Sequence, residues 1–272
     1  MGIINRTPDS FYASARYLDD DAALARAAQM VDEGVDLIDV GGVRAGQEGE
    51  WIDEATEIAR VRPFVLALRE RFPLLPISLD TWRAEVAQAC EGAVDLVNDT
   101  WQGADPDLVH VAATLDAGYV VSHTGGLPPR TDPSGIDYGP GEAVVDDVLR
   151  VLSDGAHRAL EAGVRADGVL VDPTLDFGKT TPNSLALVAA TDRVVGLGFP
   201  VLQAISRKDF VGETLSLPTD ERLEGSLAAT AVAAWLGATV FRAHDVRATR
   251  RTLDMVASIR GDRPPARAER GR

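Results

Sequence analysis

The sequence predicts an α/β protein that folds as a single-domain (β/α)8 TIM barrel, and two observations support this. Short apolar segments typical of β-strands alternate with longer amphipathic segments, eight of each, along the 272 residues. The short segments are apolar nearly throughout, as in parallel strands that helices cover on both faces. We therefore expect one barrel over 1–261 and a disordered, Pro- and Arg-rich tail over 262–272. A doubly wound open sheet is the alternative fold.

The predicted elements alternate strictly along the chain. Strands are expected over 1–5, 35–41, 76–80, 94–98, 118–123, 168–172, 200–205 and 238–243. Helices are expected near 19–33, 50–72, 82–91, 105–117, 142–162, 182–197, 219–237 and 245–260. Pro63 predicts a kink or break in the second helix, because proline lacks a backbone N–H. The first strand begins at Met1, which suggests that the natural start lies upstream.

Composition excludes several classes of function. A net charge of -15 disfavours a nucleic-acid-binding surface and an anionic membrane surface. No segment reaches the roughly 18 consecutive apolar residues of a membrane span. The single Cys90 rules out an intrachain disulfide and fits a reducing cytoplasm. We therefore expect a cytoplasmic protein whose partners are small molecules, with no nucleic acid and no membrane among them.

Each predicted strand ends at or just before a polar or charged residue. These residues are Asn5, Asp39, Asp80, Asn98, His123, Asp172, Lys208 and His244. Any one of them could simply cap the next helix. In a barrel, however, the carboxyl ends of all strands surround one mouth, where active sites lie. The recurrence therefore predicts one site built from residues far apart in the sequence.

The mouth residues fall into two groups with different chemistry. Asp80, Asn98 and Asp172 suit a flat ligand with adjacent N–H donors, such as a 2-amino-4-oxo pyrimidine ring. The second group follows the last two strands, where barrels often hold phosphate, and consists of Arg207, Lys208, Arg242 and His244.

Metal and nucleophile signatures are weak in this chain. The His and Cys residues show no zinc spacing, and no Ser/His/Asp triad has a recognisable elbow. Asn5 with Asp9 offers oxygen ligands to a hard cation that mainly rides on phosphate, as Mg²⁺ does.

Seven ordered motifs carry a family resemblance. They are "INRTPDSF", "DVGG", "LDT", "NDT", "DPTLDFGKT", "SRK" and "FRAHDV". Together they resemble the dihydropteroate synthase family of folate biosynthesis, of which this chain looks like a divergent member. The resemblance implies a (β/α)8 barrel, usually a homodimer. It also implies a transferase that joins 6-hydroxymethyl-7,8-dihydropterin diphosphate to p-aminobenzoate and releases diphosphate with the help of Mg²⁺.

The resemblance also implies roles for individual residues. Pterin contacts match Asp80, Asn98, Asp172, Phe177 and Lys208; diphosphate contacts match Asn5, Arg242 and His244, with Asn5 also on the metal. The catalytic set is Asp80, Asp172, Lys208 and Arg242, and the second substrate would meet Ser206 and Arg44.

The loops depart from the family pattern. The loop over 41–46 is shorter by two residues than the family's and lacks its Ser-Thr pair and its Pro. Loops often determine which substrate an enzyme accepts. The sequence therefore predicts that pterin-diphosphate recognition is retained, and it does not decide whether p-aminobenzoate is recognised.

Three alternative functions remain. One is a paralogue that binds pterin diphosphate without condensing it with p-aminobenzoate. Another is a methyltetrahydrofolate-type pterin-binding methyltransferase domain, against which "SRK" and "FRAHD" argue. A purely structural protein would not explain the polar strand ends.

The helix "RLEGSLAATAVAAWLG" is apolar most of the way round, which favours a subunit contact.

Overall fold

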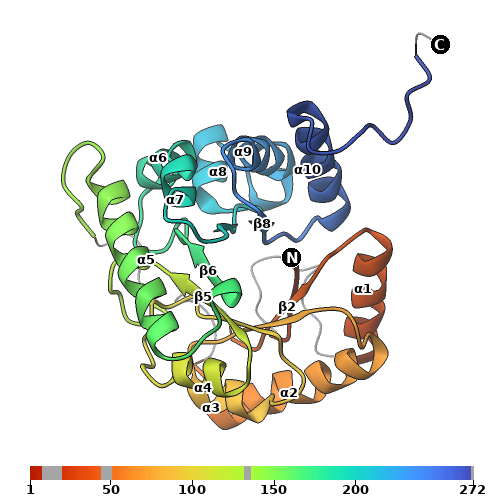
Figure 1. Ribbon diagram of the computed structural model, residues 1–272, viewed down its shortest axis with the longest axis vertical. Coiled ribbons are helices and arrows are strands. Elements are labelled where there is room, and N and C mark those ends of the chain that lie inside the picture. Colours follow the sequence, from red (N-terminus) through yellow and green to blue (C-terminus); the bar gives the residue numbers. More distant parts are fainter. Residues whose placement is uncertain (8–19, 44–50, 132–135, 271–272) are drawn as a thin grey trace.

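A computed structural model describes residues 1–7, 20–43, 51–131 and 136–270. A ring of helices surrounds the strands (Figure 1). The eight strands are β1 (Gly2–Asn5), β2 (Ile38–Gly41), β3 (Ile77–Asp80), β4 (Leu96–Asn98), β5 (Gly118–Ser122), β6 (Val169–Asp172), β7 (Leu202–Gln203) and β8 (Val240–Phe241). The first six form one parallel sheet in sequence order, and β7 pairs with β8 in parallel.

Two short backbone links close these sheets into a barrel. Val171 of β6 bridges Val201, and the Val171 N–H donates to the Pro200 carbonyl at 3.0 Å. On the other side Gly2 of β1 bridges Ala243, whose N–H donates to the Met1 carbonyl at 2.9 Å. The predicted (β/α)8 barrel is therefore confirmed, and the open sheet is excluded.

The helices largely follow the predicted order. They are α1 (Asp20–Asp32), α2 (Glu54–Arg71), α3 (Ala84–Ala89), α4 (Leu108–Thr114), α5 (Ala143–Glu161), α6 (Thr181–Ala189), α7 (Thr191–Val195), α8 (Asp209–Leu215), α9 (Leu223–Trp235) and α10 (Val246–Arg260), with short 3₁₀ turns at Ala166–Gly168 and Thr219–Glu221. No helix in the described part of the chain is long and apolar enough to cross a bilayer.

Three details differ from the sequence-based expectation. Helix α2 continues through Pro63 without a break, because the Asp53 cap and the buried Phe64 and Leu68 hold both sides of the proline. The helix expected over 182–197 is divided into α6 and α7 at Ala190. Helix α8 was not predicted, since its seven residues are too few to show a clear helical period.

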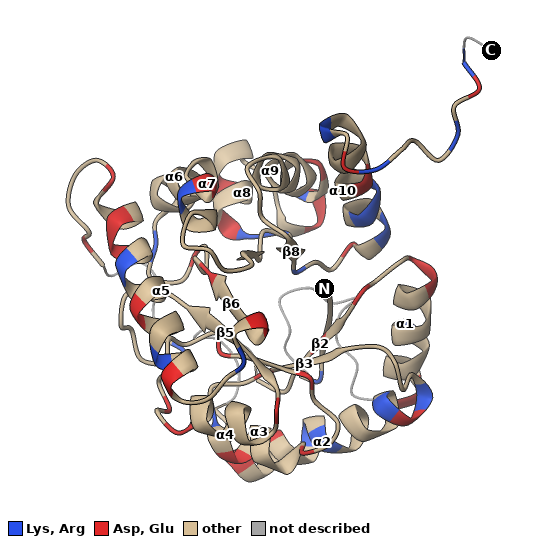
Figure 2. Cartoon of the chain, viewed as in Figure 1, with Lys and Arg blue, Asp and Glu red and all other residues tan. Residues whose placement is uncertain are grey.

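The barrel has an outer and an inner apolar core. Alternate strand residues such as Val97 and Val171 face the helices, where most of the apolar packing lies. Met1, Leu96, Val120 and Leu202 form a second cluster that fills the interior. Near the carboxyl ends of the strands the inward-facing residues are polar. Apolar residues that face the helices therefore alternate there with polar residues that face the barrel interior. Figure 2 shows charged residues at strand ends as well as on the outer helices.

Helix α5 lies unusually close to β5 because of Gly155. A methyl group added at Gly155 would stand 2.4 Å from Cγ1 of Val121, which is less than any real carbon–carbon contact. The glycine therefore permits the close packing of α5 on the strand that leads into the mouth.

We predict that Gly155→Ala destabilises the protein by about 1–3 kcal/mol, the usual cost of overpacking a core. In an open helix site the same change would stabilise by about 1 kcal/mol, so the sign is diagnostic. Urea unfolding measures the effect. Ser153→Ala, two residues away on α5, is the control and is expected to change the unfolding free energy by less than about 0.5 kcal/mol.

Candidate functional site

The strand ends bring three of the predicted site residues, Asn5, Asp80 and Asn98, into one row. Asn5 pairs with Gly41, Gly41 with Asp80, and Asp80 with Asn98, so four neighbouring strands end at the same level. A Cβ added at Gly41 would lie 3.5 Å from Asp80 Oδ2 and 3.6 Å from Asn5 Oδ1. The missing side chain at Gly41 thus leaves room between these two oxygens.

Arg242 links this row to the end of β8. Its Nε donates to Asp39 Oδ2 at 2.6 Å, and its Nη2 donates to Asp80 Oδ2 at 2.7 Å. Burial opposes the charge, but Asp39 and Asp80 outweigh it and raise the pKa of Arg242 above its ordinary value. The guanidinium is therefore a permanent cation among buried carboxylates.

Burial and two charged neighbours act on the pKa of Asp80 in different directions. Burial raises its pKa to about 6, Arg242 opposes the rise, and Asp39 adds to it. Thr100 holds the other oxygen, donating to Asp80 Oδ1 at 2.7 Å. Asp80 thus titrates close to neutral pH.

Asp172 ends β6 and is oriented by its own loop. The backbone N–H of Thr174 donates to Asp172 Oδ1 at 2.7 Å. Burial raises the pKa of Asp172, while this N–H bond and the charges of Lys208 and Lys179 act in the opposite direction. Two ammonium groups therefore offset part of the effect of burial on this carboxyl group.

Lys208 and two aromatic rings form one wall of the site. Lys208 Nζ lies 4.3 Å from the centroid of the Phe177 ring and donates to the Leu175 carbonyl at 2.7 Å. Trp101 meets Phe177 edge to face, with ring centroids 5.3 Å apart. Trp101 thus supports this wall from the loop after β4.

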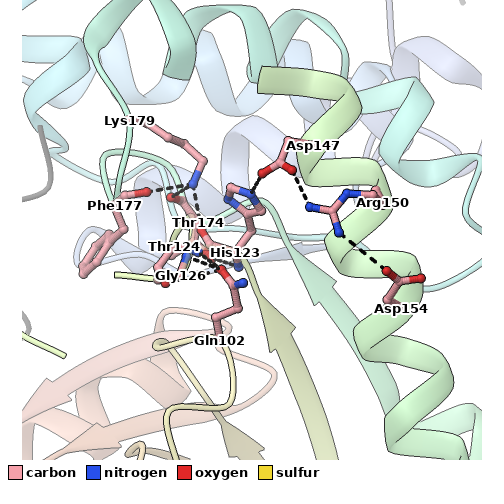
Figure 3. Close-up of polar contacts among 10 residues, drawn as sticks. All are labelled: Gln102, His123, Thr124, Gly126, Asp147, Arg150, Asp154, Thr174, Phe177 and Lys179. Carbon is pink, nitrogen blue, oxygen red and sulfur yellow. Dashed lines mark hydrogen bonds and ion pairs between the residues drawn. The ribbon is translucent and has the colours of Figure 1, made fainter. Parts of the chain in front are cut away.

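The loop after β6 is fastened by a second lysine that sequence reasoning did not single out. Lys179 Nζ donates to the carbonyls of His123, Thr174 and Phe177 at 2.7, 3.0 and 2.8 Å (Figure 3). Burial lowers the pKa of Lys179 to about 7, and Asp172 opposes that shift. Three carbonyls match the three donors of an ammonium group, so the bonded form is the charged one. Lys179 and Lys208 are the only lysines in the sequence, a signal that could have identified Lys179.

Not every polar strand-end residue contributes to this row. The imidazole of His123 is turned towards helix α5, where Nε2 lies 3.0 Å from Asp147 (Figure 3). Burial lowers the pKa of His123 to about 4, so the ring is neutral. Arg207, grouped above with the phosphate-binding residues, instead donates to Asp245 at 2.8 Å.

The remaining predicted residues lie beside the last two strands or outside the described part. The backbone N–H of His244 donates to Ser206 Oγ at 3.2 Å. Burial, with a contribution from Arg242, lowers the pKa of His244 to about 3, so this histidine is neutral too. Arg44 and Asp9 lie outside the described residues.

We predict that Lys179→Met destabilises the protein by about 3 kcal/mol or more, since each buried carbonyl left unpaired costs about 1–3 kcal/mol. Urea unfolding at about pH 6, below the pKa of Lys179, measures the loss. Lys208→Met is the matched control: it removes one carbonyl contact instead of three, so we expect a loss of about 1 kcal/mol. Equal losses in the two variants would contradict this account of the loop.

Comparison with known proteins agrees with this geometry. The family model described as "Pterin binding enzyme" matches residues 1–244. The chain is 56% identical over its whole length to "Inactive dihydropteroate synthase 2" of Mycobacterium leprae, of which it covers 94%. It is 36% identical to the dihydropteroate synthase of Clostridium beijerinckii, over 95% of this chain and 93% of that protein.

The solved structures lead to the same family. A dihydropteroate synthase of Xanthomonas albilineans with 4-aminobenzoic acid superposes with a TM-score of 0.84 at 33% identity, over 95% of this chain and 92% of that one. These matches agree with the barrel and with the row of hydrogen-bond acceptors at its mouth. The chain therefore belongs to the pterin-binding enzyme family, alongside the dihydropteroate synthases.

Proposed function

We propose that this protein works as a dihydropteroate synthase, joining 6-hydroxymethyl-7,8-dihydropterin diphosphate to p-aminobenzoate and releasing diphosphate. One observation carries the proposal: Asp80, bonded directly to Arg242, lies in the same row as Asn98. Acceptors suited to the N–H edge of a pterin therefore stand next to a cation suited to its diphosphate.

The proposed chemistry assigns a task to each half of the site. The amine nitrogen of p-aminobenzoate forms a bond to the pterin methylene carbon, the C–O electron pair leaves with diphosphate, and the amine loses a proton. Asp80 and Asp172 stabilise the positive charge that develops on the pterin. Arg242 stabilises the departing oxygens, and His244 acts there as a neutral donor.

Mg²⁺ fits the donors at this mouth as a companion of the diphosphate. The described residues contain no group of three or more His, Cys, Asp or Glu that could hold a metal by themselves. The Asn5 side-chain oxygen beside Gly41 is a suitable ligand for a hard cation that mainly rides on phosphate. Such an ion would neutralise charge on the leaving diphosphate.

A second candidate is a paralogue that binds pterin diphosphate without condensing it with p-aminobenzoate. The M. leprae relative carries the word "inactive" in its name, and so does the M. tuberculosis relative at 52% identity. The short loop over 41–46 points the same way, because loops usually decide which second substrate is accepted. The same pterin and diphosphate contacts serve both candidates.

The decisive experiment separates binding from turnover. Isothermal titration with the pterin diphosphate tests the site, and a product assay with p-aminobenzoate tests the reaction. We expect binding and product formation from the unmodified chain, and loss of both in Asp80→Ala. Binding without product would favour the paralogue, and absence of binding would refute both candidates. Growth of a folate-synthesis-deficient strain rescued only by the unmodified chain is the cellular counterpart.

We predict that pterin diphosphate binds more weakly in acid because Asp80 takes up a proton as the pH falls through about 6. A neutral carboxyl accepts N–H bonds poorly, so we expect an affinity about tenfold lower at pH 5 than at pH 7. Calorimetry across this range measures the change. Asp80→Asn should bind weakly with a flatter pH profile; an unchanged profile would assign the titration to another group.

We also propose a homodimer formed through the outer face of α9 and α10. Val232, Trp235, Met255 and Ile259 project from these helices with between 48% and 61% of their surface exposed. Large apolar side chains gathered on packed helices are typical of a subunit interface.

We predict that Trp235→Glu converts this dimer into a monomer, because a charge cannot be buried there without a partner. Light scattering measures the mass. Leu74→Glu, at a more exposed apolar residue between α2 and β3, is the control and should leave the mass unchanged. A monomeric unmodified protein would overturn the proposal.

A further inference from the structure

A third carboxylate, Asp39, lies in the barrel interior below the row of pterin residues. Its side chain has no exposed surface, so it cannot reach a ligand itself. It accepts hydrogen bonds from Ser78 Oγ and from Arg242 Nε, each at 2.6 Å, and from Asn98 Nδ2 at 3.3 Å. The partners come from β3, β4 and the residue after β8, so Asp39 on β2 connects two neighbouring strands with the far end of the chain.

Asp39 fixes the rotation of the Arg242 side chain. A guanidinium has five N–H donors in one plane. Asp39 takes the Nε donor and Asp80 takes one Nη2 donor, so the plane is held at two points. Among the described residues Nη1 has no hydrogen-bond partner, and 20% of the Arg242 side chain is exposed. The open edge of the guanidinium is therefore the one left for an anion.

Asp39 also settles which way the Asn98 amide points. The Asn98 amide nitrogen donates to both carboxyl oxygens of Asp39, at 3.3 and 3.4 Å, so this nitrogen faces Asp39. The Asn98 oxygen is then the atom available to a ligand. This orientation adds a third acceptor to those of Asp80 and Asp172.

We propose that Asp39 is a positioning residue: it holds Arg242 in the orientation that binds the diphosphate group, without touching substrate. This inference rests on the proposed function, since it concerns the diphosphate half of the same site. Its main effect is expected on the diphosphate, because the 2.6 Å bond to Arg242 is much shorter than the bonds to Asn98.

The test compares two ligands that differ only in the diphosphate. Calorimetry measures the affinities of 6-hydroxymethyl-7,8-dihydropterin and of its diphosphate for the unmodified chain and for Asp39→Asn. We expect the substitution to reduce the affinity gained from the diphosphate by about tenfold or more, the scale of one lost charge-assisted contact. The affinity for the pterin alone should change by less than about threefold.

Ser78→Ala is the matched control. It removes the other 2.6 Å bond to Asp39 but leaves the contact with Arg242, so the advantage of the diphosphate ligand should persist. A merely structural Asp39 would weaken both ligands equally in Asp39→Asn, and that result would overturn the proposal. An unchanged ratio of the two affinities would do the same.

A further measurement separates this inference from the proposed function. If the unmodified chain binds neither ligand, the proposed function fails, yet the Asp39–Arg242 contact can still be tested by thermal unfolding. We expect the Tm losses of Asp39→Asn and Arg242→Met to be strongly non-additive in the double variant. Additive losses would show that the two side chains do not act together, and the positioning role would be rejected.

Discussion

The site depends on one partly buried cation, Arg242, between two carboxylates. Asp39 and Asp80 come from adjacent strands, and two ionised carboxyl groups this close in a dry interior would repel each other. Arg242 removes the conflict by binding both. It follows β8, and the next residue, Ala243, makes the backbone bridge that joins this end of the chain to β1. The backbone bridge that closes the barrel therefore also brings Arg242 to its two carboxylate partners.

The loops after β6 and β7 are strained and firmly held. Thr174, Asp176 and Arg207 have φ values of 51°, 69° and 58°, a region that non-glycine residues adopt at a cost of about 1–3 kcal/mol each. Each is fastened: the Thr174 N–H bonds to Asp172, the Asp176 carboxylate accepts the Asp209 N–H at 2.7 Å, and Arg207 pairs with Asp245. The wall formed by Phe177 and Lys208 is thus carried by a rigid backbone.

The sequence was sufficient for the barrel and for the row of Asn5, Asp80 and Asn98, because polar residues that end successive parallel strands must meet at one mouth. It was insufficient for side-chain direction. Asp172 and His123 both close apolar runs, yet Asp172 lies in the mouth and His123 faces α5. Strand residues alternate between the two faces, but when both faces are buried in apolar surroundings the sequence does not reveal which parity is inward.

Lys179 was not singled out, and Asp39 was placed among the polar strand ends without a role, for a related reason. Their partners are backbone carbonyls and side chains on other strands, and such contacts depend on strand register and loop path. In "DFGKT" a lysine follows a glycine, a pattern that is also typical of an exposed loop. The three carbonyls that accept from the Lys179 ammonium come together only when β5 and β6 are paired. Local sequence patterns predict which element a residue occupies better than they predict what that residue holds in place.

The two candidate functions differ in where their determinants lie. The residues proposed to contact pterin and diphosphate lie mainly at strand ends and in the firmly held loops beside them, where Arg242 compensates the charges of Asp39 and Asp80. Contacts with a second substrate are expected from loops, which tolerate sequence change better than the strands that they connect. A chain can therefore lose condensation while it keeps pterin binding, its stability and a TM-score of 0.84 to a synthase. Overall structural similarity shows that the barrel is the same. Only an assay of turnover with p-aminobenzoate tests whether the loops accept the second substrate.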